Sequence, residues 1–227
     1  VAGSLVRTPR RRDMTRWSMA LVAGVVAQIV IGAFVVKSGL DYSVVAIHFL
    51  VSMALVAAAV VLVQRAGEPD DRPVSRPRWP GWAKALVTSC TAVLLSGPLV
   101  SSAGPHPGAV AGEGGHDHVL HRLPIDLVWV ARAHSATVWV FLVLVVVIAW
   151  RMRQVDAVLQ RRLVDLVVVT VAQGALGYTQ YFTGVPAVLV GIHVLGATLL
   201  WIMTLRVAMV ARPVPAVEAR PAAVAAP

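Results

Sequence analysis

Residues 27–48 read AQIVIGAFVVKSGLDYSVVAIH, and residues 172–193 read AQGALGYTQYFTGVPAVLVGIH. These stretches are two copies of one unit, because every matched residue lies 145 positions (193 − 48) from its partner. The matched residues are Ala27/Ala172, Gln28/Gln173, Gly32/Gly177, Gly39/Gly184, Val45/Val190, Ile47/Ile192 and His48/His193. A repeat of this length predicts a fold that is built twice from the same helical unit.

The composition indicates an integral membrane protein. Of the 227 residues, 58% are hydrophobic and 14% are charged, and the mean hydropathy is +0.76. Six apolar runs are each long enough, at about 20 residues, to cross a bilayer as a helix. They are predicted at 17–37, 43–64, 83–103, 127–150, 163–183 and 186–210. We therefore expect an all-α membrane protein with six transmembrane helices.

The runs also divide the chain. Residues 1–66 are expected to be the remainder of an N-terminal half, with residues 1–16 as a loop, and 67–82 a cytoplasmic loop. Residues 83–210 are expected to form the C-terminal half, which is a four-helix bundle and a pseudo-repeat of the first half. The Ala/Pro/Val tail at 211–227 is predicted to be disordered. The single cysteine, Cys90, lies in an apolar run and is expected to be a small core residue.

The basic residues predict the orientation in the membrane. The net charge is +9, but the cations lie between apolar runs and form no common face, so the pattern does not favour a nucleic-acid partner. All of the 20 Lys and Arg except Lys37, Arg122 and Arg132 fall on one side of the predicted topology. Under the positive-inside rule that side is cytoplasmic, and so are both ends of this chain.

Three histidines lie inside the predicted spans, about two turns from the outer end of each helix: His48, His134 and His193. Ionisable side chains within a membrane are costly and commonly serve a site, although an interhelical hydrogen bond also remains open. Zinc or copper would recruit further ligands, and the neighbouring sequence offers none. Two histidines on facing helices of a bundle can hold a haem, and His134 with His193 is the favoured pair. Gly177 would let a flat macrocycle approach, with close helix packing as the alternative.

The remaining histidines lie in the predicted outer loop between the third and fourth runs. For His116 and His118, a solvated loop and a metal site are both open interpretations. His121 or Arg122 could lie over the edge of a cofactor. The full set in this loop is His106, His116, His118 and His121.

The repeat also predicts a missing partner for His48. The two histidines of the second copy lie 59 positions apart (193 − 134), so the equivalent partner of His48 would fall before Val1. We expect that this chain lacks two N-terminal helices of an eight-helix protein made of two four-helix bundles. A natural six-helix protein is the alternative.

The repeated pattern of Gln28, Gly32 and His48 with Gln173, Gly177 and His193 resembles the haem A synthases, and most closely their actinobacterial branch. This resemblance covers about Thr15 to Arg206. It implies a bacterial plasma-membrane oxidoreductase, multi-pass, that oxidises the C8 methyl group of its substrate, haem O, to a formyl group, making haem A for cytochrome oxidase.

The resemblance also implies roles for particular residues. His134 and His193 would hold haem b as the cofactor, and His48 would be a ligand of the substrate haem. The first histidine of that half and an essential glutamate would lie ahead of Val1, so this chain alone is expected to bind one haem without turnover. Ser135 stands where the family often has Arg, which leaves Arg132 or Arg122 as the partner of the haem propionates.

Two other functional classes remain open from the sequence. One is a cytochrome b-like electron carrier without substrate chemistry, and the other is a small-solute transporter with structural histidines. The sequence indicates no particular electron donor, and it is compatible with a homo-oligomer surrounded by membrane lipid.

Overall fold

The computed structural model describes residues 3, 11–67, 79–104 and 123–210. Within these segments the chain forms six long α-helices and no strand. The helices are α2 (Arg12–Lys37), α3 (Tyr42–Ala66), α4 (Gly81–Ala103), α5 (Leu127–Met152), α6 (Ala157–Phe182) and α7 (Ala187–Val210). Each of the six is long and apolar enough to cross a membrane. The predicted all-α membrane fold is therefore confirmed.

Helix α2 begins earlier than its apolar run predicted, at Arg12 instead of near residue 17. The expectation that residues 1–16 form a loop is therefore wrong for residues 12–16. This first turn carries charged side chains, including Asp13, which a hydropathy window reads as loop. An acidic residue is nevertheless favourable there, because it faces the positive end of the helix dipole.

Helix α6 also begins earlier, at Ala157 instead of near residue 163. Its start is set by Asp156, whose carboxylate accepts hydrogen bonds from the backbone N–H groups of Val158 (2.7 Å) and Leu159 (3.2 Å). Such a cap satisfies donors that have no partner within the helix. The first turns of α6 are charged, and they extend the helix beyond its apolar segment.

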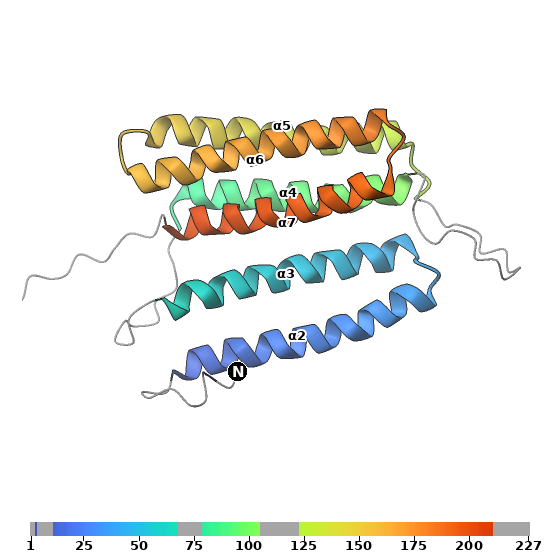
Figure 1. The fold of residues 1–227 in the computed structure, drawn as a ribbon, viewed down its shortest axis with the longest axis horizontal. Helices are drawn as coiled ribbons and strands as arrows, with labels where there is room; N and C mark the ends of the chain where they lie inside the picture. Colours follow the sequence, from blue (N-terminus) through green and yellow to red (C-terminus); the bar gives the residue numbers. More distant parts are fainter. Residues whose placement is uncertain (1–2, 4–10, 68–78, 105–122, 211–227) are drawn as a thin grey trace, which may run out of the picture.

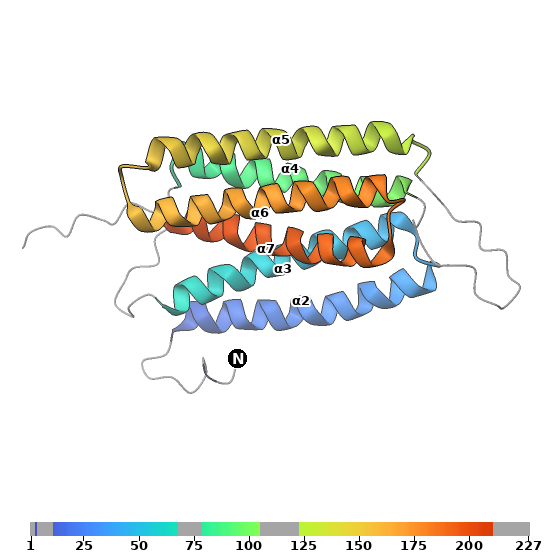
Figure 2. The ribbon, with the colours of Figure 1, turned by 45° about the horizontal axis from the view of Figure 1, so that its top comes forward.

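The helices α4, α5, α6 and α7 form a closed four-helix ring. In this ring α4 packs on α5, α5 on α6, α6 on α7, and α7 on α4, while α5 and α7 face each other across the diagonal. Helix α3 packs against α4 and α7, and α2 packs against α3 alone among the described helices. Figures 1 and 2 show the ring as one block, with α3 and then α2 beside it.

The turns that join α2 to α3 and α6 to α7 have the same conformation. Both contain a glycine followed by a second residue in the left-handed region: Gly39 (φ 66°) with Leu40 (φ 62°), and Gly184 (φ 80°) with Val185 (φ 60°). In each, the N–H of the second residue donates to the carbonyl five residues earlier, at 2.9 and 2.8 Å respectively. This is the Schellman arrangement, which satisfies carbonyls at a helix end. We call the end of the bundle that carries these turns the turn end.

The tightly packed core lies in the half of the ring away from the turn end. Its fully buried side chains include Leu86 of α4, Phe141 of α5, Leu163 of α6 and Val207 of α7. Cys90 also lies in this core, as predicted. Close packing of this kind fixes the relative positions of the four helices.

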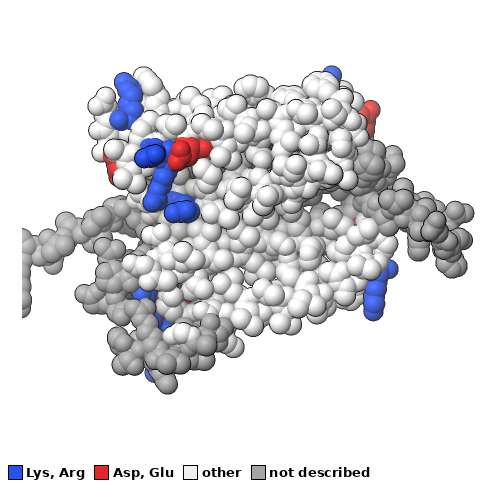
Figure 3. Space-filling model, viewed as in Figure 1, with Lys and Arg blue, Asp and Glu red and all other residues white. Residues whose placement is uncertain are grey.

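Basic side chains gather at the end opposite the turn end, as Figure 3 shows for one face. Among the described residues, only Lys37 and Arg132 lie on helix segments near the turn end. This asymmetry is the one on which the predicted orientation rests.

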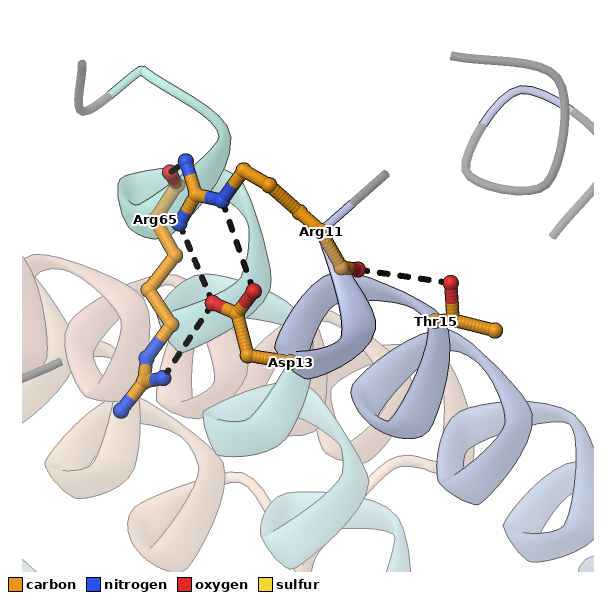
Figure 4. A network of polar contacts seen from close by, with 4 residues as sticks. All are labelled: Arg11, Asp13, Thr15 and Arg65. Atoms are coloured by element: carbon orange, nitrogen blue, oxygen red, sulfur yellow. Dashed lines mark hydrogen bonds and ion pairs between the residues drawn. The ribbon is translucent and has the colours of Figure 1, made fainter. Parts of the chain in front are cut away.

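A polar network joins the ends of α2 and α3 at this basic end (Figure 4). The carboxylate of Asp13 pairs with Arg11 (3.1 Å) and with Arg65 from the last turn of α3 (3.7 Å). The guanidinium of Arg11 also donates to the backbone carbonyl of Arg65 (3.2 Å). The hairpin of α2 and α3 is thus tied at its open end as well as at its turn.

Candidate functional site

The three histidines of the spans lie at one depth in the bundle. Helices α3, α5 and α7 all begin at the turn end, and His48 and His193 are each the seventh residue of their helix, while His134 is the eighth. At 1.5 Å per residue, all three lie roughly 10 Å along the helix from its first residue. The equal depth follows from the matching turns, which start α3 and α7 at equivalent positions.

Each imidazole rests against a glycine of the preceding helix. A Cβ built on Gly32 of α2 would lie 3.5 Å from Cε1 of His48, and one on Gly177 of α6 would lie 3.3 Å from Cε1 of His193. The same contact occurs in the α4–α5 pair, where a Cβ on Gly97 would lie 3.7 Å from Cε1 of His134. The absence of a side chain at these positions lets the rings lie close to the neighbouring backbone.

His134 has a hydrogen-bond partner on its ring. Its Nδ1 lies 2.8 Å from the Ser96 hydroxyl of α4. Ser96 also lies 3.0 Å from the carbonyl of Val93 and 3.1 Å from the Thr137 hydroxyl. Thr137 in turn donates to the backbone carbonyl of His134 at 2.7 Å. Ser96 thus contacts the ring from α4, and Thr137 links the Ser96 hydroxyl to the backbone of α5 at His134.

The other two histidines lack such a partner. Within the described residues, Nδ1 of His48 and Nδ1 of His193 are buried without a hydrogen-bond partner. The glutamines matched by the repeat lie one turn deeper. Gln28 donates through Nε2 to the backbone carbonyl of His48 (2.9 Å) and contacts Ser52, while Gln173 packs against Gly196 of α7.

His134 and His193 lie at similar depth on α5 and α7, the helices that are diagonal to each other in the ring. Burial is incomplete around them: no residue of 95–101, 131–140, 171–182 or 187–195 is fully buried. The helix segments around this pair are therefore less closely packed than the core beneath them.

The structure brings some predicted site residues together and leaves others apart. Arg132 is exposed and lies over the ring of Trp129, at 5.3 Å from its centre. Since residues two positions apart on a helix point to nearly opposite sides, its side chain leaves α5 away from His134. The predicted contact of Arg132 with a propionate stays a prediction. Arg122 and the four loop histidines lie outside the described residues.

Among the described residues, no group of three or more His, Cys, Asp or Glu side chains lies together as a metal site. His134 and His193 would supply two nitrogen ligands from diagonal helices of the ring. Such a pair suits a metal that brings its other ligands with it, as the iron of a porphyrin does.

Sequence reasoning missed three residues of this site: Ser96, Gly97 and Thr137. The repeat pairs 27–48 with 172–193, so it offered no second copy of α4 or α5 with which to compare them. A weak signal was present, since the polar and small residues Ser96 and Gly97 interrupt an apolar run just before Pro98. Only the packing of α4 on α5 shows that they meet His134.

These observations define a class: a polytopic helical membrane protein with a repeated hairpin and interior histidines at one depth. Comparison with known families gives a match over residues 1–205 to the COX15-CtaA family, described as cytochrome oxidase assembly protein. The chain belongs to this family, which is that of the haem A synthases, and the predicted resemblance is confirmed. Comparisons with curated proteins and with solved structures gave no match.

Proposed function

We propose that this protein is a haem A synthase, which oxidises the C8 methyl group of haem O to a formyl group, with haem b held between His134 and His193. Membership of the cytochrome oxidase assembly family supports the pathway. The observation that carries the proposal is the placement of these two histidines at one depth on the diagonal helices α5 and α7, each against a glycine of the preceding helix.

The residues around the pair fit a haem. Nδ1 of His134 is engaged by Ser96, which leaves Nε2 as the nitrogen for iron. Gly97 and Gly177 place no side chain between the imidazoles and the neighbouring helices. His134 and His193 would hold haem b, which would supply electron transfer when bound. The chain would hold the ring between two helices and exclude water from it.

The hairpin of α2 and α3 is proposed to bind the substrate. His48 occupies the position equivalent to His193, and Gly32 the position equivalent to Gly177. Gln28 fixes the backbone of α3 at His48, so the imidazole is presented at a defined height. Haem O carries a long hydrocarbon tail, and a site that opens to lipid suits it.

The membrane location and orientation are part of the same proposal. We infer a multi-pass protein of a bacterial plasma membrane, with both ends of this chain on the cytoplasmic side. The gathering of basic side chains at the end opposite the turns supports this orientation.

The haem site is tested by the absorbance of the purified protein. We expect a Soret band and one haem b per chain, lost in His134→Ala and in His193→Ala. His48→Ala serves as the matched control, since it removes an equivalent imidazole from the other hairpin and should keep this haem. Loss of haem from His48→Ala alone, with both other variants loaded, would contradict the assignment.

The synthase activity is tested with the protein expressed from its complete coding sequence, which is incubated in its membrane with haem O, oxygen and a reductant while haem A is detected by mass. Haem A formation supports the proposal. A protein that holds haem b and cycles between oxidised and reduced states, yet yields no haem A, would instead be an electron carrier.

A further inference from the structure

The hydroxyl of Ser96 sets the two histidines of the ring apart from each other. Nδ1 of His134 lies 2.8 Å from Ser96 Oγ, whereas Nδ1 of His193 is buried and has no hydrogen-bond partner in the part of the chain that the structure describes. The two imidazoles therefore present different electronic environments to anything that they bind together.

The direction of this hydrogen bond follows from counting protons. Two hydroxyls, those of Ser96 and Thr137, lie beside two backbone carbonyls, those of Val93 (3.0 Å from Ser96) and His134 (2.7 Å from Thr137). Each hydroxyl carries one proton and can satisfy one carbonyl. With those protons on the carbonyls, Ser96 Oγ is available to accept a hydrogen bond from Nδ1–H of His134. Binding of a metal through Nε2 requires this same tautomer, because its lone pair is on Nε2.

We propose that Ser96 is a positioning residue that fixes the tautomer of His134 and makes it the stronger electron donor of the two haem ligands; this rests on the proposed function. A ligating imidazole that donates its other N–H to an acceptor is oriented by that bond and becomes more basic. A more basic ligand stabilises ferric over ferrous iron, so Ser96 lowers the midpoint potential of the one-electron Fe(III)/Fe(II) couple. Hydrogen bonding around the ligands is a recognised means of setting that potential.

The test compares serine variants of the full chain in detergent by potentiometric titration of the haem α band and by EPR of the ferric form. Ser96→Ala is expected to keep the haem, shift the midpoint potential to more positive values and change the EPR g-values. Ser96→Thr keeps a hydroxyl and should restore both. Should Ser96→Ala lose its haem, Ser96→Cys replaces it, and its weak acceptor should give a smaller positive shift.

Ser102→Ala is the matched control. Its hydroxyl lies on the same helix, is buried, and donates to the Pro98 carbonyl (2.7 Å). It should leave the potential unchanged. A fully loaded Ser96→Ala with wild-type potential, or an equal shift in Ser102→Ala, would overturn the role of Ser96. A wild-type protein that binds no haem would overturn the proposed function itself. The absorbance of the purified wild-type protein distinguishes that result from a failure of the role of Ser96.

Discussion

At the scale of single residues, the glycine–imidazole contacts are the feature that recurs. In the described part of the chain each of the three span histidines has one, and each glycine lies on the helix that precedes its histidine. The repeat in the sequence showed two of these pairs. The third, Gly97 with His134, required the packing of α4 on α5, because no spacing in the sequence relates them.

Gly177→Val tests whether this contact is needed. A Cβ there would lie 3.3 Å from Cε1 of His193, and the further methyl groups would displace the ring. Overpacking of this kind costs about 1–3 kcal/mol, so we expect a several-fold loss of bound haem, measured as haem per protein after purification.

Gly174→Val is the control for that substitution. It lies on the same helix, and a Cβ there would meet no atom within 4 Å. It should keep the wild-type haem content. Equal loss of haem in both variants would mean that helix propensity, and not contact with His193, explains the effect.

At the scale of helices, the apolar runs predicted all six elements but misplaced two starts. Hydropathy detects the part of a helix that lies in lipid, so the charged first turns of α2 and α6 were assigned to loops. The carboxylate of Asp156 before the α6 run was an available sign of the true start. The arrangement of the helices in a ring was expected from the repeat, yet the packing of α3 on α7 was not.

The turns between helices allow a sharper test. Val185 has φ 60°, a conformation that a β-branched residue adopts only with strain. Val185→Gly should therefore stabilise the protein by up to about 1 kcal/mol, since glycine adopts positive φ readily. Thermal unfolding in a fixed detergent measures this as a higher midpoint.

Val188→Gly provides the comparison for the turn. Val188 is exposed in the first turn of α7, where glycine should lower stability by roughly 0.5 kcal/mol through its poor helix propensity. If both variants lower the midpoint, the positive φ of Val185 is not a source of strain.

At the scale of the whole molecule, the charge asymmetry between the two ends predicts how the protein sits in its membrane. Lys37 lies near the turn end and Lys84 near the other end, and both are exposed. In intact cells, a membrane-impermeant maleimide should label Lys37→Cys, and it should label Lys84→Cys only after lysis. Labelling in the reverse order would contradict the orientation. The native Cys90 is fully buried and provides the unlabelled background.

The sequence predicted the class of the molecule and its family more fully than its site. Composition and the repeat are properties of the chain as a whole, so both can be recognised from the sequence alone. The hydroxyls beside His134 do not follow any period, and their role depends on which faces of α4 and α5 meet. The same holds for Arg132. It is close to His134 in sequence, but residues two positions apart on a helix point to nearly opposite sides.

Helix α7 belongs to both halves of the molecule. It carries His193, and its Gly196 packs against Gln173 of α6. Five residues after Gly196, Nε1 of Trp201 donates to the backbone carbonyl of Met53 in α3, at 3.0 Å. A slide or tilt of α7 that moved His193 would also pull on α3, five residues beyond His48. The two halves of the repeat are thus mechanically coupled through helix α7. A mutation that repositions one imidazole must be accommodated by a shift at the other.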